Sequence, residues 1–362
     1  MMPPIMAYNF VKMLQDCRKK KNPAFALRAH SEMCSNGLEV HPAIGNYLVP
    51  MFVDCGSLTD AERVFLKLIQ RNEQSWTSLI RGFTESGKCL DAFHLFHSMQ
   101  MDQVPASAFT FRVLIKACSR LQALKGGHYI HMETVRESCE SDSFVGNTLV
   151  DMYAKCGSLA DAQGVFNQLE HRDVVSWTSL IGGYREAGDN EEVLRCWDQM
   201  QHEKVFPNVV TYASVLLSCG STEALDKGCE IHRDAVKNGF EQDSFVGNAL
   251  INMYGKHGAL LEAKEVLEEM FVKDVVSWTT LIAAYAKHGF FNDAQECLVQ
   301  MKEGGVSPNL VCWNAVISEY AEHGLGEVAL QCMEKMQQES IYPDIITLTS
   351  ITKACGKAKC IS

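Results

Sequence analysis

Two His-x-Glu triplets come nearest, by residue type and spacing, to catalytic chemistry in this sequence. In zinc deaminases such a triplet supplies a metal ligand and a general acid–base, and a P-C-x-x-C segment completes the metal site. The triplets are His30-Ser-Glu32 and His131-Met-Glu133, but the sequence contains no C-x-x-C. Its 15 cysteines lack ligand spacing and no secretory signal peptide precedes them, which favours free thiols packed between helices. We therefore expect no metal, no cofactor and no catalytic residue.

A glycine–lysine segment also resembles a known site, a phosphate-binding loop. It runs Gly82-Phe-Thr-Glu-Ser-Gly-Lys88, but it lacks the final Ser or Thr that would contact magnesium, and no predicted strand precedes it. Its counterpart Gly183–Gly188 lies 101 residues further along and is followed by Asp189. The two His-x-Glu triplets are also 101 residues apart, so both features are positions of a repeat.

Several landmark residues recur at this interval of 101 residues. They are Trp76, Trp177 and Trp278; Cys17, Cys118 and Cys219; and Gly56, Gly157 and Gly258. A fixed period that continues over most of a chain predicts a solenoid, in which each unit packs on its neighbours.

The totals agree with a long solenoid but constrain its partner. The chain has 362 residues, 47% of them hydrophobic, which is enough to bury a continuous spine. A net charge of -11 and a pI of about 5.6 argue mildly against nucleic acid, although they leave room for a local basic stripe. No apolar run approaches the ~18 residues of a membrane span.

The period divides into segments of 35, 35 and 31 residues. The predicted repeats are 7–41, 42–72, 73–107, 108–142, 143–173, 174–208, 209–243, 244–274, 275–309 and 310–344, with a short tail at 1–6 and a partial repeat at 345–362. In each repeat the apolar residues have helical spacing, as in Trp177, Leu180, Ile181 and Tyr184. Gly188 ends that helix and a second helix follows. The sequence thus predicts an all-α solenoid of helix hairpins, wound as a right-handed superhelix.

This organisation resembles the pentatricopeptide repeat family, in its plant PLS class, where three repeat types alternate. The stretch Asp173-Val-Val-Ser-Trp-Thr-Ser-Leu-Ile-Gly-Gly-Tyr184 opens a P-type repeat. Phe109-Thr-Phe-Arg-Val-Leu-Ile-Lys-Ala-Cys118 is similar to the L type, and Phe144 to Gly157 is similar to the 31-residue S type. The order of types from residue 7 onward is L-S-P-L-S-P-L-S-P-P-L.

The resemblance implies binding of single-stranded RNA, with one nucleotide per repeat read by the fifth and the last residue. The implied pairs are Asn147 with Asp173, Asn248 with Asp274 and Asn314 with Asp344 for uracil; Thr178 with Asn208 and Thr279 with Asn309 for adenine; Asn46 with Asn72 for cytosine; and Thr77 with Ser107, without an assigned base. The implied site is C-n-n-U-A-n-U-A-U.

Two further sets of residues follow from the same resemblance. The second residue of a repeat would wedge between bases, and the implied wedges are Phe144, Val175, Phe245, Val276 and Val311. Cations near the end of the first helix would contact phosphate, and they are Lys19, Arg120, Lys155, Lys256 and Lys287. Acidic residues occupy that position in other repeats, so we expect phosphate contacts to be patchy.

Two alternatives remain open from the residues themselves. Asn and Asp at these positions are common helix caps, so Asp173 and Asp274 could be structural alone. An acidic helical solenoid could also be a scaffold that binds peptides in its groove.

The resemblance also implies a location in mitochondria or chloroplasts, where the chain would direct RNA processing or editing together with other proteins. No transit peptide is visible, and the chain stops inside a repeat without an E/DYW-type domain, so we expect a fragment.

Overall fold

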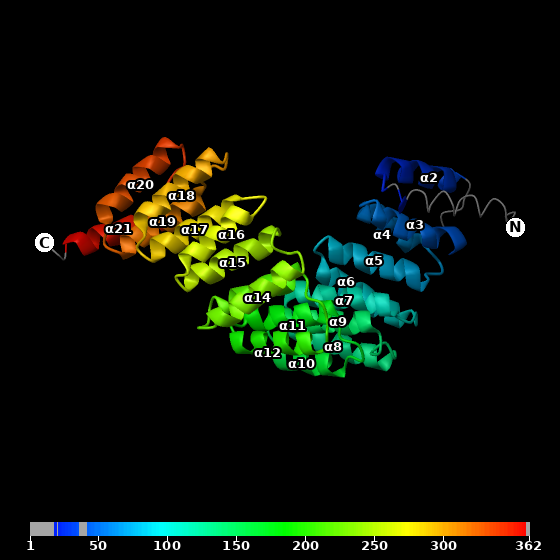
Figure 1. Ribbon diagram of the computed structural model, residues 1–362. Coiled ribbons are helices and arrows are strands. Elements are labelled where there is room, and N and C mark those ends of the chain that lie inside the picture. Colours follow the sequence, from blue (N-terminus) through cyan, green and yellow to red (C-terminus); the bar gives the residue numbers. More distant parts are fainter. Residues whose placement is uncertain (1–17, 20, 36–41, 360–362) are drawn as a thin grey trace. The chain divides into compact units, whose positions relative to one another are not determined.

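A computed structural model describes residues 18–19, 21–35 and 42–359, and every regular element in these ranges is a helix, labelled α2 to α21 (Figure 1). The predicted all-α solenoid fold is confirmed. Most of the first helix of the predicted repeat 7–41, with Cys17, lies outside these ranges, as do residues 360–362. None of the described helices is long and apolar enough to cross a membrane.

The helices alternate along the chain as first and second helices of hairpins. The first helices are α3 (Pro42–Asp54), α5 (Glu73–Glu85), α7 (Ala108–Leu121), α9 (Ser143–Lys155), α11 (Val174–Glu186), α13 (Val209–Cys219), α15 (Ser244–Lys256), α17 (Val275–Lys287), α19 (Leu310–Glu322) and α21 (Ile345–Lys359). The second helices are α2 (Pro23–Ser35), α4 (Leu58–Lys67), α6 (Cys89–Met101), α8 (Leu124–Arg136), α10 (Leu159–Gln168), α12 (Asn190–His202), α14 (Leu225–Lys237), α16 (Leu260–Glu269), α18 (Phe291–Glu303) and α20 (Gly326–Gln338).

The chain forms two compact units, Met1–Gly183 and Tyr184–Ser362. In the first unit α3, α5, α7 and α9 pack successively side by side, and in the second α13, α15, α17, α19 and α21 do the same. Each of the second helices α4, α6, α8, α14, α16 and α20 packs on its own first helix and on the next one along the chain. First helices therefore form one continuous layer within a unit, and second helices cover the other side.

The core lies between these two layers. The predicted apolar face of α11 is buried, since Trp177, Leu180 and Ile181 are inaccessible to solvent and Tyr184 is nearly so. The ring of Trp177 meets that of Phe166 edge-on, with centroids 4.5 Å apart. Such aromatic contacts stabilise beyond the area that they bury, by about 0.5–1.5 kcal/mol.

Glycines set the turns and the spacing between hairpins. Gly188 has φ +78°, the left-handed conformation predicted for the end of the helix before it. Gly255 serves a different purpose, because a Cβ atom there would lie 2.6 Å from the Cβ of Ala284. The absence of that atom lets α15 and α17 approach closely.

Most of the described cysteines are buried between helices. Burial raises the pKa of Cys118 and of Cys196 to about 12. Their thiols therefore stay protonated at neutral pH, and thiols in that state are poor nucleophiles and poor metal ligands. These cysteines therefore pack between helices as small apolar side chains.

Histidines join the ends of neighbouring first helices in the second unit. His288 follows α17, and its Nε2 lies 2.8 Å from the carbonyl oxygen of Gly255 in α15. His257 makes the same contact with Cys219, at 3.0 Å, and His323 with Lys287, at 3.2 Å. A carbonyl can only accept a hydrogen bond, so the ring Nε2 must be the protonated nitrogen in each case.

Polar residues cap the first helices at their amino ends. Asp274 precedes α17, and its Oδ1 accepts a hydrogen bond from the backbone N–H of Ser277, at 2.8 Å. The same arrangement occurs at Asn72, Ser107, Asp142, Asp173, Asn208, Asp243, Asn309 and Asp344. These caps satisfy backbone donors that would otherwise lack a partner.

Two replacements of Asp274 test whether its side chain caps α17. We expect Asp274→Ala to cost about 1 kcal/mol of local stability, because the N–H of Ser277 loses its acceptor. Asp274→Asn retains an acceptor oxygen and should change stability little. Hydrogen exchange of the amides in α17 measures the difference. Equal loss of protection in both variants would contradict the capping role.

Removing one histidine tests the contact between helix ends. His288→Ala should weaken the association of α17 with α15 by about 1 kcal/mol, the usual net value of one hydrogen bond. The matched control is His202→Ala, at the exposed end of α12. Faster amide exchange in α15 and α17 is expected only for His288→Ala, and identical exchange in the two variants would refute it.

Candidate nucleic-acid interface

A groove of about 490 Å³ runs across α15, α17 and α19 in the second unit. Its volume falls within the ~300–1,000 Å³ typical of small-ligand sites. The groove brings together predicted residues of all three kinds, namely the wedges Val276 and Val311, the readers Thr279 and Asn309, and the cations Lys256 and Lys287. The stacking of hairpins at constant spacing causes this, because equivalent positions of successive first helices face the same side.

Among the groove residues that the sequence analysis did not select are one amide and one carboxylate side chain. Asn252 lies one helical turn after Asn248, and its Oδ1 is buried without a hydrogen-bond partner. Glu319 adds a carboxylate from α19. The spacing of four residues from Asn248 was a signal for Asn252, since residues i and i+4 share a helix face. No repeated pattern pointed to Glu319.

Two of the predicted Asn–Asp pairs are hydrogen-bonded to each other. In the first unit, Nδ2 of Asn147 donates to both carboxylate oxygens of Asp173, at 3.0 and 2.9 Å. In the second, Nδ2 of Asn314 donates to both oxygens of Asp344, at 3.1 and 3.2 Å. A carboxylate accepts hydrogen bonds only, so the amide NH2 group must face it and the amide oxygen must point away.

The amide oxygen of Asn147 has no hydrogen-bond partner although its residue is only 6% exposed. The oxygen of Asn314 instead accepts a hydrogen bond from the hydroxyl of Thr347. The backbone N–H of Thr347, its hydroxyl and Asn314 hold the pKa of Asp344 below its usual value. Asp344 is therefore ionised at neutral pH, which keeps it an acceptor.

The third predicted Asn–Asp pair differs in detail. The structure records no hydrogen bond between Asn248 and Asp274. The carboxylate of Asp274 caps α17 and accepts a bond from the hydroxyl of Ser277, at 3.1 Å. The Oδ1 atom of Asn248, like that of Asn147, lacks a partner. The buried Oδ1 of Asn248 is thus an acceptor that no hydrogen bond satisfies.

The threonine pairs are arranged through their own helices. The Thr279 hydroxyl donates to the carbonyl of Val275 at 2.6 Å, and Oδ1 of Asn309 caps α19 through the N–H of Cys312. The Thr178 hydroxyl makes the same contact with Val174, at 2.6 Å. Its predicted partner Asn208 caps α13 in the other compact unit.

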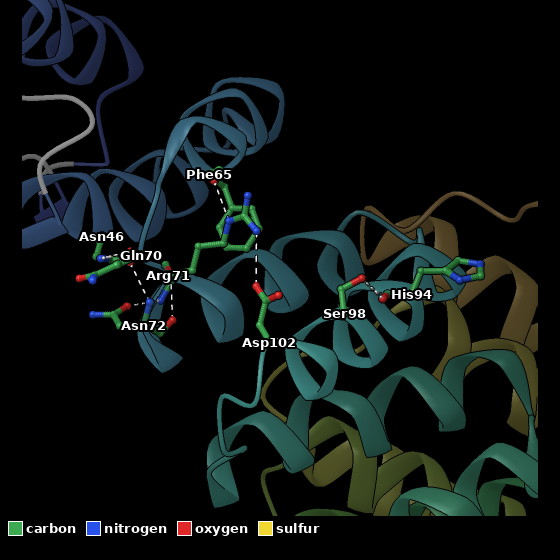
Figure 2. Close-up of polar contacts among 9 residues, drawn as sticks. Asn46, Phe65, Gln70, Arg71, Asn72, His94, Ser98 and Asp102 are labelled. Carbon is green, nitrogen blue, oxygen red and sulfur yellow. Dashed lines mark hydrogen bonds and ion pairs between the residues drawn. The ribbon is translucent and has the colours of Figure 1, made fainter.

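The pair Asn46 and Asn72 is engaged with backbone instead (Figure 2). Nδ2 of Asn46 donates to the carbonyl of Gln70, and its Oδ1 accepts from the N–H of Asn72, both at 3.0 Å. The side chain of Asn72 caps α5 through the N–H of Ser75. Asn46 therefore orients the segment before α5.

The remaining predicted pair is Thr77 with Ser107, and both of these residues are hydrogen-bonded to Glu73.

The predicted wedges are all exposed, from 53% for Val175 to 72% for Phe245. The guanidinium of Arg112 lies over the Phe144 ring, 5.0 Å from its centroid, in a cation–π contact. Single exposed apolar side chains are common on protein surfaces, so it is the recurrence of these at equivalent positions of the first helices that distinguishes them.

The predicted cations are less uniform. The guanidinium of Arg120 donates to the carbonyl of Thr84, Lys155 forms an ion pair with Asp151 at 2.9 Å, and Lys256 bonds to the Ser221 hydroxyl at 3.1 Å. The described part of the chain contains no ion-pair partner for Lys287, which lines the groove. Lys19, near the start of the described residues, is exposed.

Comparison with known proteins places the repeat in a family. A model described as the PPR repeat family matches residues 71–120, 172–221, 273–312 and 308–357, and a PPR repeat model matches residues 147–174 and 248–275. Together these ranges cover more than half of the chain.

Two similar relatives come from Arabidopsis thaliana. A chloroplastic pentatricopeptide repeat-containing protein is 35% identical over 271 residues, which are 75% of this chain and 44% of the relative. A mitochondrial one is 34% identical over 296 residues, covering 78% and 43%. The chain thus spans less than half the length of these relatives.

Among solved structures, the pentatricopeptide repeat protein PPR10 in complex with an 18-nucleotide psaJ RNA element matches with a TM-score of 0.83. It is 19% identical, and the match covers 99% of this chain and 54% of that one. The structure of PPR10 from maize, described without RNA, matches with a TM-score of 0.54. The fold, the helix repeats and the matched ranges agree, and the chain belongs to the pentatricopeptide repeat family.

Proposed function

We propose that this chain binds single-stranded RNA in a sequence-dependent manner, with one base read by each repeat. The observation that carries the proposal is the groove across α15, α17 and α19, where two exposed valines, two polar readers and two lysines converge. Stacking surfaces, hydrogen-bonding groups and cations are the three components that a binding site for single-stranded nucleic acid combines. The RNA named with the similar PPR10 structure supports the same class of ligand.

The bonding of Asn147 suits uracil in particular. Asp173 holds the amide NH2 group, and the buried Oδ1 lacks a partner, so this oxygen is the acceptor that we propose for the N3–H of the base. The second proton of Nδ2 can donate to a carbonyl beside that N3–H. Uracil presents one N3–H between two carbonyl oxygens, so hydrogen bonds to its Watson–Crick edge use one acceptor and one donor of the side chain.

The two valines support stacking of the base between consecutive repeats. Val276 and Val311 occupy the same position in α17 and α19 and are 58% and 65% exposed. A planar base placed between them would cover both side chains and remove apolar surface from water. Contacts of this kind contribute about 1–3 kcal/mol per base when the side chain is aromatic, and less for valine.

Charge limits the phosphate contribution. The net charge is -11, and Glu319 lies in the groove with Lys256 and Lys287. Few cations are available, so the affinity should depend on contacts to bases more than on counterion release. The same acidic balance favours the second candidate function, a scaffold that binds an extended basic peptide.

The proposal extends to the role of the RNA contact in the cell. The similar Arabidopsis proteins are named chloroplastic and mitochondrial, which supports an organellar setting. The chain would act as a specificity factor for RNA processing or editing, with the chemistry carried out by other proteins in trans. We also propose that the chain belongs to the PLS class of the family, in which P-, L- and S-type repeats alternate.

Selection from a random single-stranded RNA pool tests sequence dependence. Enrichment of U-A-n-U-A-U is expected, and Asn248→Thr should remove the preference for uracil at its position because the amide donor and acceptor are lost. The expected change is about 1 kcal/mol or more, or at least ~5-fold. Gln201→Ala, on the exposed second helix α12, is the control. Binding of basic peptides without any RNA would favour the scaffold.

Salt dependence tests the phosphate contact. Lys287→Gln should weaken binding to all RNA sequences alike and reduce the slope of log K against log salt by about 0.7, the value for one phosphate on a single strand. The control is Lys335→Gln on α20, which is exposed away from the groove lining. An unchanged slope would remove Lys287 from the interface.

A further inference from the structure

An acidic residue occupies the first position of α5, beside the predicted readers Thr77 and Ser107. This residue is Glu73, whereas the same position in the other Trp-containing repeats has an apolar residue. Those residues are Val174, Val275 and Leu310. The sequence pattern of readers and wedges did not use this position.

Glu73 forms a compact hydrogen-bonded cluster with three hydroxyl groups. Its Oε1 lies 2.6 Å from Oγ of Ser107, 2.9 Å from Oγ1 of Thr77 and 3.2 Å from Oγ1 of Thr110. The two threonine hydroxyls are 2.6 Å from each other. Thr77 is 3% exposed and Thr110 fully buried, so water competes little for these bonds.

Counting protons shows what this cluster offers to a ligand. Each hydroxyl has one proton to donate. Ser107 and Thr77 each reach Glu73, and Thr110 reaches Thr77, so all three protons have acceptors within the cluster at 2.9 Å or less. The groups that remain for a ligand are lone pairs and the second carboxylate oxygen. The reader pair of this repeat therefore presents acceptors only.

We propose that Glu73 is a specificity-determining residue of the repeat 73–107, which makes this repeat select bases that carry an amino group and discriminate against uracil. The inference rests on the proposed RNA binding and concerns the base that follows the cytosine in the site C-n-n-U-A-n-U-A-U. The other reader pairs differ from Thr77 and Ser107 because each of them contains an asparagine, whose amide NH2 group can donate a hydrogen bond to a base.

The chemistry of the bases explains the direction of this preference. Cytosine, adenine and guanine each present an exocyclic amino group on the Watson–Crick edge, and a carboxylate accepts well from such a group. Uracil presents a single N3–H between two carbonyl oxygens. Those oxygens would face the carboxylate and the hydroxyl lone pairs without a proton between them, which is unfavourable in a partly buried site.

A purely structural role for Glu73 makes a different prediction. A carboxylate in the first turn of a helix is stabilised by the helix dipole, and the cluster links α5 to α7 through Ser107 and Thr110. Removing it would then change stability and overall affinity, but not the ratio of affinities for RNAs that differ in one base. That ratio is the readout that separates the two roles.

The test measures the affinity of the full chain for four RNAs that differ only in the base opposite the repeat 73–107. The wild type should bind the uracil RNA at least about fivefold more weakly than the other three. Glu73→Val, which copies the residue of the repeats 174–208 and 275–309, should reduce this ratio to below about twofold because the hydroxyl protons become available. Glu73→Gln keeps the shape and adds an amide donor, so it should also accept uracil.

Two controls make the outcomes distinct. Glu85→Gln removes a charge from the exposed end of the same helix and should leave the ratio unchanged. A second RNA series varies the base opposite Asn314, which tests the proposed function independently. Suppose that the chain discriminates between bases opposite Asn314, but that wild type, Glu73→Val and Glu73→Gln all show the same affinity ratio at the repeat 73–107. That outcome would overturn the role of Glu73 and leave the proposed RNA binding intact. A folded chain that binds none of these RNAs would overturn both proposals.

Discussion

Every feature of this molecule depends on the inability of a single helix hairpin to bury its own apolar face. In α17, for example, Leu281 and Ile282 are inaccessible to solvent because the second helices α16 and α18 pack on one side of it and the neighbouring first helices α15 and α19 pack beside it. Close approach is built into the contact, as Gly255 and Ala284 show. Successive first helices therefore pack side by side, and in the second unit this brings equivalent residues of α15, α17 and α19 into one groove.

The junction between successive repeats carries two roles on the same side chain. Asp173 caps α11 through the N–H of Ser176 and also holds the amide of Asn147. A carboxylate has two oxygens and about four acceptor sites, so it can do both without competition. Capping and base reading are therefore compatible explanations for the recurring Asp and Asn residues, and the capping geometry is what fixes the direction of the adjacent amide.

Equivalent positions differ in chemistry when their neighbours differ. Asn147 and Asn46 are both the fifth residue of a repeat, but the amide of Asn147 donates to a carboxylate and that of Asn46 to a backbone carbonyl. Thr279 bonds to its own helix, whereas Thr77 belongs to a cluster around Glu73. A reading rule based on two residues per repeat omits these neighbours, although they decide which protons and lone pairs face a ligand.

Local, repeated features of this chain could be predicted from its sequence, and contacts between different helices could not. Helical periodicity, glycine turns and a period of 101 residues were enough to predict the all-helical solenoid and the buried face of α11, because each of these is a local property repeated many times. The wedge positions came from the family resemblance, and the structure shows that their side chains are exposed. Glu319 in the groove and the histidine contacts between helix ends were not predicted, since each involves residues on different helices.

By itself the sequence determined the helices, their apolar faces and the repeat, because these follow from spacing along one chain, and its motifs carried the resemblance to the family. Only the tertiary structure decided which polar atoms are already satisfied: the free oxygen of Asn147, the backbone-bound amide of Asn46 and the protons taken up by Glu73. The physical reason is that a hydrogen bond depends on distance and direction between groups about 3 Å apart. Sequence spacing places such groups on a shared face but does not set those distances.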